Sequence, residues 1–373
     1  MMFADQERDL AKLTAADRYR SLRPRQGVDF ASNDYLGLAG SERLRAAMTD
    51  ALQRGVPVGS GGSRLLRGNA PEHETLEAEA ARFFGTEAAL FFASGYVANT
   101  ILFATLPQRG DLIVHDALIH ASAHEGIRLT RATFAAAAHN DADAFEDAIV
   151  AWRASGGTGR VWIAVESLYS MDGDQAPLAA LAEIADRHNA VLLIDEAHAT
   201  GVFGTDGRGL AETLEGRENV ITLRTCGKAL GCEGALLCGP TVMREFIVNR
   251  GRGFIFSTAP SPLMALAVGE ALRIVADEPA RRERLWTSIA TAERVLAPYG
   301  VAATGSQILP LVLGDAARTM RVAGAIQAAG FDVRGIRPPT VPDGGSRLRI
   351  SLTLNATVAD IEALGAVMGE ALQ

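Results

Sequence analysis

Residues 191–201 read VLLIDEAHATG, and residues 221–239 read ITLRTCGKALGCEGALLCG. In the first stretch an apolar strand ends at the carboxylate of Asp195, and His198 follows shortly after it. In the second stretch a strand leads into a glycine-rich turn that holds Thr225 and Lys228, and another apolar strand comes next. Ligands of doubly wound sheets bind at the carboxyl ends of the strands. The two stretches therefore predict an α/β fold with reactive side chains along one sheet edge.

Apolar runs alternate with helical patterns from about residue 86 to residue 240, which is typical of an α/β protein. We expect strands at residues 88–92, 111–114, 160–165, 191–195, 220–223 and 234–238. Their apolar character is continuous, which favours a mostly parallel sheet with helices on both faces. Residues 177–189, PLAALAEIADRHN, predict a helix with Pro177 in its first turn.

The pattern changes after about residue 275, where a helix, a turn-rich segment, the strand RLRISLT and a last helix follow. We therefore expect three parts: an N-terminal arm over residues 1–40, a large domain over residues 41–275 and a smaller α+β domain over residues 276–373.

The composition is that of a globular protein with an acidic balance. The sequence has 36 Lys plus Arg against 44 Asp plus Glu, a formal net charge of −8. This balance gives no general attraction to nucleic acid or to anionic membranes. No apolar run is long enough to span a bilayer and the N-terminus is charged, so we expect a cytoplasmic protein. The three cysteines have no metal-ligand spacing, and we expect no metal site.

Asp195 and Lys228 together indicate pyridoxal phosphate (PLP) chemistry. A carboxylate after a strand can keep a pyridinium nitrogen protonated, which makes a PLP ring an electron sink. A lysine among glycine and apolar residues loses solvation, which favours the neutral amine that forms an imine. The alternatives are a structural capping pair for Asp195 and His198, a surface role for Lys228, and a DEAH-type helicase box. The helicase reading lacks a G-x-x-x-x-G-K-[ST] phosphate loop.

Two other strand ends carry polar residues. The turn of Ser94, Gly95 and Tyr96 leads from a strand into a helix, so its backbone N–H groups suit a phosphate, although such turns often only cap the helix. In DLIVHDALIHAS, His115 and His120 follow a strand, where an imidazole can stack on a flat ring or serve as a hydrogen-bonded structural residue.

Asn33 and Arg349 lie at opposite ends of the chain. An arginine at a domain junction can bind a substrate carboxylate through two parallel hydrogen bonds, which a lysine does less well. A surface ion pair is the alternative for Arg349, and no argument from the residues alone brings it together with Asn33.

Taken in order along the chain, several segments resemble the α-oxoamine synthases, which are PLP enzymes of fold type I. The segments are SNDYLGL, GSGGSRLLRGN, SGY, HASAHEG, SMDGD, IDEAHATG, TCGKALG, FSTAPSP and RPPTVPDGGSRLRIS. The resemblance implies a PLP-binding large domain, a smaller C-terminal domain, and a homodimer with active sites shared between subunits.

The resemblance also implies roles for individual residues. Lys228 would form the Schiff base with PLP, Asp195 would pair with the ring nitrogen, and His120 would stack on the ring. The phenolic oxygen of PLP would be approached by His198 and Ser170. The remaining implied contacts are Ser94, Gly95, Tyr96 and Thr225 around the phosphate, Ser257 and Thr258 from the partner subunit, Asn33 and Arg349 on the amino-acid carboxylate, Ser63 in the amino-acid pocket and Glu166 as support.

Within the family, AHND at residues 138–141 and RPPTVP at residues 337–342 favour a member of biotin synthesis. That member joins L-alanine to a pimeloyl thioester of coenzyme A or acyl carrier protein, with loss of carbon dioxide. Sibling enzymes that use glycine or serine are the nearest alternatives, namely glycine C-acetyltransferase, 5-aminolevulinate synthase and serine palmitoyltransferase, since one methylene discriminates weakly. A non-catalytic subunit of the same fold is a remote alternative, since it would be expected to lose Lys228. Arg20 and Arg23 are candidates for binding the acyl tail, with a solvated helix face as the alternative.

Overall fold

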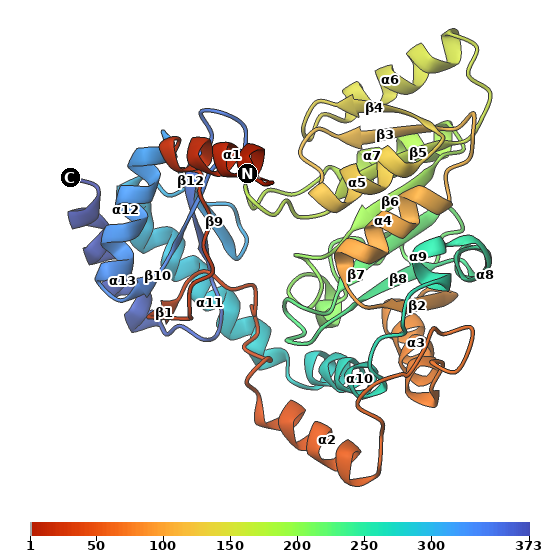
Figure 1. Cartoon of the computed structure of the whole chain (residues 1–373), viewed down its shortest axis with the longest axis horizontal. Helices are drawn as coiled ribbons and strands as arrows, with labels where there is room; N and C mark the ends of the chain where they lie inside the picture. The colour runs from red at the N-terminus through yellow and green to blue at the C-terminus, as the bar shows by residue number, and fades with distance from the viewer. Residues whose placement is uncertain (1) are drawn as a thin grey trace. The chain divides into compact units, whose positions relative to one another are not determined.

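The structure is a computed structural model that describes residues 2–373, and the chain divides into two compact units (Figure 1). Unit 1 holds residues 2–35, Ser170–Asp174 and Glu283–Gln373. Unit 2 holds Leu36–Tyr169 and Gln175–Arg282. The expected domain bounds at residues 40 and 275 stay a prediction, because compactness alone does not define a part that folds by itself.

Unit 2 is built on a seven-stranded sheet among the described residues, with strand order β2-β8-β7-β6-β5-β3-β4. The strands are β2 (Ala88–Phe92), β3 (Leu112–Asp116), β4 (Thr133–Ala137), β5 (Val161–Glu166), β6 (Val191–Asp195), β7 (Val220–Thr225) and β8 (Ala235–Gly239). Strands β4, β3, β5, β6 and β7 are parallel, whereas β8 is antiparallel to both β7 and β2. The expected mostly parallel sheet is confirmed.

Helices cover both faces of this sheet (Figure 1). In β6, Leu193 belongs to the apolar cluster on one face, and Leu192 and Ile194 belong to the cluster on the other. The helices of unit 2 are α2 (Glu42–Gln53), α3 (Pro71–Phe84), α4 (Gly95–Thr105), α5 (Ala121–Leu129), α6 (Ala142–Ala154), α7 (Leu178–Arg187), α8 (Thr241–Arg250), α9 (Arg252–Ile255) and α10 (Pro262–Asp277), with short 3₁₀ turns at Thr205–Gly207 and Glu212–Leu214. Pro177 is the N-cap of α7 and so precedes its first turn.

The sequence analysis did not predict strand β4. Its sequence is TFAAA, and alanine has a low preference for strands. The strand lies at the end of the sheet and leaves most of its side chains at least partly exposed, including Phe134. An edge strand of this kind lacks the continuous apolar run that marked the other strands.

Unit 1 contains a three-stranded sheet of order β11-β12-β9 and a two-stranded sheet of β1 and β10. The strands are β1 (Val28–Asp29), β9 (Ile308–Gly314), β10 (Phe331–Asp332), β11 (Arg334–Ile336) and β12 (Ser346–Ser351). The helices are α1 (Ala4–Ala15), α12 (Ala316–Ala328), α13 (Val358–Ala371), the 3₁₀ turn Ala297–Tyr299 and the greater part of α11 (Pro279–Leu296). Because β1 pairs with β10, the N-terminal arm is joined to the C-terminal part of the chain by backbone hydrogen bonds.

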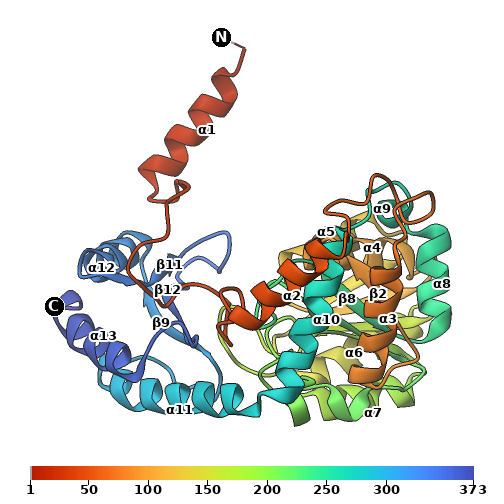
Figure 2. The same cartoon turned by 90° about the horizontal axis from the view of Figure 1, so that it is seen from below.

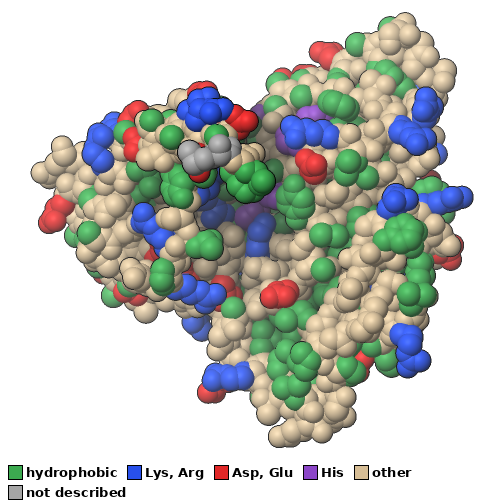
Figure 3. All heavy atoms as spheres, viewed as in Figure 1, with side chains coloured by type: hydrophobic (Ala, Val, Ile, Leu, Met, Phe, Trp, Pro, Cys, Tyr) green, Lys and Arg blue, Asp and Glu red, His purple; other side chains and the backbone are tan. Residues whose placement is uncertain are grey.

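Helix α1 buries none of its residues and extends by itself from unit 1 in Figure 2. Positive and negative side chains are interspersed over the face drawn in Figure 3, in keeping with the mixed composition. Among residues 2–373, no helix has the length and apolar character needed to cross a membrane.

A fully buried ion cluster lies under the turn that follows β6. Arg224, in β7, pairs with Glu215 through Nη2 and lies 3.6 Å from the carboxylate of Glu196. The Nη1 group of Arg224 also contacts the hydroxyl of Thr200 at 3.3 Å. Glu196 and Thr200 are on either side of His198, so this one guanidinium holds both sides of the turn that carries the histidine.

The carboxylate of Glu196 also accepts the backbone N–H groups of Leu210 and Ala211, each at 2.9 Å. A Cβ at Gly209 would lie only 1.7 Å from that carboxylate, so this position requires glycine. Burial raises the pKa of Glu196 to about 7, and the nearby Arg224 opposes this effect.

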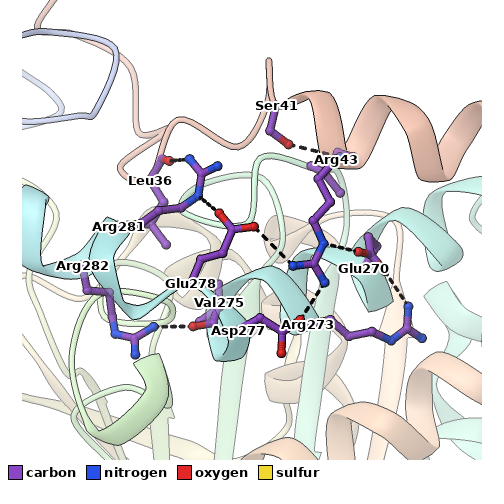
Figure 4. A network of polar contacts seen from close by, with 11 residues as sticks. Leu36, Ser41, Arg43, Glu270, Arg273, Val275, Asp277, Glu278, Arg281 and Arg282 are labelled. Carbon is purple, nitrogen blue, oxygen red and sulfur yellow. Dashed lines mark hydrogen bonds and ion pairs between the residues drawn. The ribbon is translucent and has the colours of Figure 1, made fainter.

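A second ionic network attaches α2 to α10 at the surface (Figure 4). Arg43 in α2 forms ion pairs with Glu270 at 2.6 Å, Asp277 at 2.7 Å and Glu278 at 3.2 Å. The hydrogen bonds that Arg43 donates to Asp277 and Glu270 raise the pKa of Arg43 above its usual value. The side chain of Arg43 is 35% exposed, so salt and water weaken each pair.

Replacing Arg43 should weaken the attachment of α2. We expect Arg43→Met to lower the free energy of unfolding by about 1 kcal/mol in low salt, and by less in 1 M NaCl because salt screens exposed charges. Urea denaturation at both salt concentrations measures the effect. Arg54→Met is the matched control, because Arg54, the C-cap residue of α2, forms its ion pair in the described chain with Asp50 of the same helix, and its replacement should cost less than about 0.5 kcal/mol. Equal losses at both salt concentrations would contradict an ionic origin.

Glu196 should make stability depend on pH. The pKa of Glu196 in the folded protein lies above the ordinary 4.5. Its contribution to the free energy of unfolding is therefore complete below pH 4.5 and is lost as the pH rises toward about 7. We expect the wild type to lose stability relative to Glu196→Gln over this range, by at most about 3 kcal/mol. Urea denaturation of both proteins at closely spaced pH values tests this. Parallel pH profiles would show that Glu196 does not titrate there.

Candidate active site

The carboxyl ends of three neighbouring parallel strands carry polar residues at one edge of the unit 2 sheet. Glu166 ends β5, Asp195 ends β6 and Thr225 ends β7. Glu166 lies directly opposite Asp195 in the register of the sheet. This is the edge at which α/β proteins bind ligands.

Lys228 meets His198 at this edge. The Nζ atom of Lys228 lies 2.8 Å from Nε2 of His198, which is a hydrogen-bond distance. His198 comes from the turn after β6, whereas Lys228 comes from the turn between β7 and β8. Lys228 and Lys12 are the only lysines of the sequence, a feature that the sequence analysis overlooked. Lys228 is therefore the only lysine at this edge of the sheet.

The carboxylate of Asp195 is held by two donors. Its Oδ1 accepts the backbone N–H of Ala197 at 3.0 Å, and its Oδ2 accepts the side-chain amide of Asn99 at 2.8 Å. Asn99 comes from the middle of α4 and is 3% exposed. The two bonds fix the orientation of the carboxylate.

His120 is the N-cap of α5, and its Nδ1 accepts the backbone N–H of Ser122 at 3.2 Å. Burial lowers the pKa of His120; the charge of Asp195 acts in the opposite direction, and the charge of Lys228 lowers the pKa further. The three side chains therefore act on one another at this sheet edge, and the neutral imidazole is the favoured form of His120.

The N-terminus of α4 faces Thr225. A Cβ at Gly95 would lie 3.5 Å from the hydroxyl of Thr225, so the start of the helix and the end of β7 are neighbours. Ser94 is the N-cap and accepts the N–H of Val97 at 3.2 Å, which is the capping role that the sequence analysis kept as an alternative. Tyr96, in the first turn, is half exposed. The first N–H groups of a helix have no partner within it, so this place suits an anion.

Other predicted residues of unit 2 lie in loops. Ser257 and Thr258 are exposed after α9, where they line a cavity of about 20 Å³ with Phe92 and Val97. Ser63 is partly buried, and its carbonyl accepts the N–H of Gly68 at 2.9 Å.

Arg349 is the centre of a polar group within unit 1. Its Nη2 lies 3.0 Å from Oδ1 of Asn33, and its Nε donates to the carbonyl of Ser170 at 2.6 Å. The structure thus brings together Asn33 and Arg349, which the sequence reasoning could not do. Arg349 is 6% exposed, and in the described part of the chain none of its contacts is an ion pair with a carboxylate. A buried guanidinium with only neutral partners is suited to binding an anion.

Two residues of the site were missed by the sequence analysis, namely Asn99 and Ser122. The amide of Asn99 bonds Asp195 and also Ser122, whose hydroxyl contacts Nδ1 of His120 at 2.7 Å. The available signal was an asparagine within the apolar helical segment YVANTILF, because a buried amide needs partners.

The side chains of unit 2 fit PLP. Lys228 offers an amine for the aldehyde, Asp195 a fixed carboxylate for the ring nitrogen, and Gly95 and Thr225 an anion site for the phosphate. Among residues 2–373, no group of His, Cys, Asp and Glu has the arrangement of a metal site.

Known proteins are similar to this chain over most of its length. Residues 25–364 match the family "Aminotransferase class I and II". The chain is 43% identical over 348 residues to 8-amino-7-oxononanoate synthase of Anaeromyxobacter dehalogenans, covering 92% of this chain and 86% of the relative. It is 41% identical to the enzyme of that name from Geobacter sulfurreducens, covering 96% of each.

Solved structures are similar over most of the chain. Serine palmitoyltransferase from S. paucimobilis, solved with a PLP adduct, has a TM-score of 0.88 at 25% identity, covering 99% of this chain and 97% of that one. The crystal structure of 8-amino-7-oxononanoate synthase from Francisella tularensis has a TM-score of 0.77 at 27% identity, covering 92% and 97%. The polar residues at the sheet edge agree with these similarities. The chain belongs to the class I and II aminotransferase family, in the branch that contains the 8-amino-7-oxononanoate synthases.

Proposed function

We propose that this protein is a PLP-dependent acyltransferase that joins L-alanine to a pimeloyl thioester and forms 8-amino-7-oxononanoate, a step of biotin synthesis. The observation that carries the proposal is the contact of Lys228 with His198 beside Asp195 at the carboxyl edge of the sheet. The names of the relatives that are 41–43% identical support the choice of substrates.

When bound, PLP supplies an electron sink that makes the Cα proton of an amino acid acidic. Asp195 keeps the ring nitrogen protonated, which its fixed orientation allows. Lys228 would hold the cofactor through its amine, which His198 orients at 2.8 Å, and His198 and Ser170 would serve the phenolic oxygen. His120, in its neutral form, would stack on the ring.

The phosphate is bound by the N-terminus of α4 and the strand end beside it. Ser94 caps the helix, Gly95 and Tyr96 supply N–H groups, and Thr225 supplies a hydroxyl. A partner subunit contributes its Ser257 and Thr258 to the same phosphate, in keeping with the exposure of both residues in the single chain.

The carboxylate of L-alanine pairs with Arg349 and Asn33, since Arg349 is a buried cation that lacks an ion pair in the described chain. Ser63 would line the pocket for the methyl group of alanine. Glu166 would support Asp195, which lies opposite it at the end of the neighbouring strand.

Lys228 then moves one proton. Released from the cofactor by the incoming amine of alanine, Lys228 would remove the Cα proton, and the electron pair left on Cα would attack the acyl carbon while the thiolate leaves. The bond from Cα to the carboxylate breaks next and releases carbon dioxide. Lys228 returns its proton to Cα, which completes the aminoketone.

The subunits form a homodimer through an apolar surface that the single chain exposes. Val58, Leu65, Leu66 and Phe256 have exposed fractions of 68%, 50%, 82% and 73%. Their two loops are held together by the hydrogen bond from Ala259 N–H to the carbonyl of Gly62, at 2.9 Å. Large apolar side chains exposed on neighbouring loops favour an interface, and Phe256 directly precedes Ser257 and Thr258 in the sequence.

A substrate matrix and a lysine substitution test the activity. Alanine, glycine and serine are each combined with acetyl, succinyl, pimeloyl and palmitoyl thioesters of coenzyme A and acyl carrier protein, and thiol release is measured. We expect alanine with pimeloyl thioester to be fastest, and Lys228→Ala to lower its rate by about a thousandfold or more. Lys12→Ala, the only other lysine, is the matched control. Faster turnover of glycine or serine would favour a sibling enzyme, and full activity of Lys228→Ala would refute the mechanism.

The proposed interface is tested by Leu66→Glu. Because Leu66 is exposed in the single chain, the charge should leave the subunit folded but oppose association, and sedimentation velocity should show a larger monomer fraction at equal concentration. Val242→Glu, at an apolar position of α8 that is 70% exposed, is the control and should sediment like the wild type. A wild type that sediments as a monomer at all concentrations would overturn the proposed dimer.

A further inference from the structure

Asn99 connects the two side chains that face the cofactor in the proposed function. Its Nδ2 lies 2.8 Å from Oδ2 of Asp195 and 3.0 Å from Oγ of Ser122. Oγ of Ser122 in turn lies 2.7 Å from Nδ1 of His120. Asn99 and Ser122 are 3% and 0% exposed, so water does not replace these bonds. A continuous chain of hydrogen bonds, buried at Asn99 and Ser122, therefore runs from Asp195 to His120, which is exposed.

The direction of every bond in this chain is determined. A carboxylate only accepts hydrogen bonds, so the NH₂ group of Asn99, and not its oxygen, faces Asp195. The second hydrogen of that NH₂ group points to Ser122, whose oxygen accepts it. The single hydrogen of the Ser122 hydroxyl then remains for Nδ1 of His120.

Nδ1 of His120 also receives the backbone N–H of Ser122, at 3.2 Å. A ring nitrogen that accepts hydrogen bonds carries no proton, so the proton of the neutral imidazole is on Nε2. The N-cap position of His120 in α5 thus favours the Nε2–H tautomer. The hydrogen bonds that begin at the carboxylate of Asp195 favour the same tautomer.

We propose that Asn99 and Ser122 are positioning residues that hold His120 as the neutral Nε2–H tautomer and couple its state to the carboxylate of Asp195. The role of this tautomer in turnover rests on the proposed function, whereas the tautomer itself does not. Asn99 touches Asp195 from α4 and Ser122 touches His120 from α5, so the coupling crosses two helices.

The electrostatic surroundings agree with the geometry. Burial lowers the pKa of His120, Asp195 opposes this, and Lys228 adds to it. Burial also lowers the pKa of the neighbouring His124, to which His115 and His120 contribute. The lowered pKa values of His120 and His124 favour the neutral imidazole in both residues.

The test is long-range ¹H–¹⁵N NMR of the histidine rings in the full-length holoenzyme, which identifies the protonated nitrogen without any turnover. His120→Gln assigns the His120 signals. His139 is the internal reference, because its Nδ1 contacts the carboxylate of Asp116 at 2.9 Å and must carry a proton there. We expect Nδ1 to carry a proton in His139 and to carry none in His120.

Ser122→Ala removes one of the two donors to Nδ1 and leaves the backbone N–H. The ratio of the Nε2–H to the Nδ1–H form of His120 should fall about fivefold, and the pKa of His120 should rise because a bond to its neutral form is lost. Ser122→Thr keeps a hydroxyl and should restore both values. Ser155→Ala, at an exposed serine after α6, should change neither.

Asn99→Leu provides an independent variant. It removes the only side-chain donor that the structure gives Asp195, so PLP retention on dialysis should fall about tenfold, measured by cofactor absorbance. A wild-type His120 with its proton on Nδ1, or an unchanged ratio in Ser122→Ala, would overturn the inference even if the enzyme makes the expected product. Conversely, the expected ratio in a protein with no such activity would refute only the proposed function.

Discussion

The site depends on the parallel pairing of β5, β6 and β7. Parallel strands in one sheet place their carboxyl ends at one edge, so residues that are far apart in the sequence become neighbours without any direct attraction between them. Glu166, Asp195 and Thr225 are last residues of these strands, and the loops that follow carry His198 and Lys228. A shift of register in β6 by one residue would turn Asp195 to the other face of the sheet.

Buried polar groups then fix the side chains at this edge. Arg224 holds the turn of His198 from below through Glu196 and Thr200, whereas Asn99 holds Asp195 from the side of α4. Because the cluster is buried, removing the guanidinium of Arg224 would leave the carboxylate of Glu215 without its ion-pair partner, which is far more costly than the loss of an exposed pair. The network around Arg43 is partly exposed. It attaches α2 to α10 but does not orient the side chains at the sheet edge.

The two units offer complementary chemistry. Unit 2 holds an amine, an imidazole and a carboxylate, which suit a cofactor with an aldehyde and a ring nitrogen. Unit 1 holds the guanidinium of Arg349, which is buried beside Asn33 with neutral partners. The proposed reaction needs both kinds of group, since a proton must be moved at Cα while the carboxylate of the amino acid is bound.

The sequence by itself determined the α/β class, the six apolar strands and the polar residues at their ends, because continuous apolar runs and the residues after them are local features. It also indicated Lys228 and Asp195. Strand β4 escaped because an alanine-rich edge strand has no such run. Only the tertiary structure brought Arg349 to Asn33, and only it placed Asn99 between Asp195 and Ser122. Hydrogen bonds between distant segments follow from how the chain packs, and no spacing in the sequence encodes them.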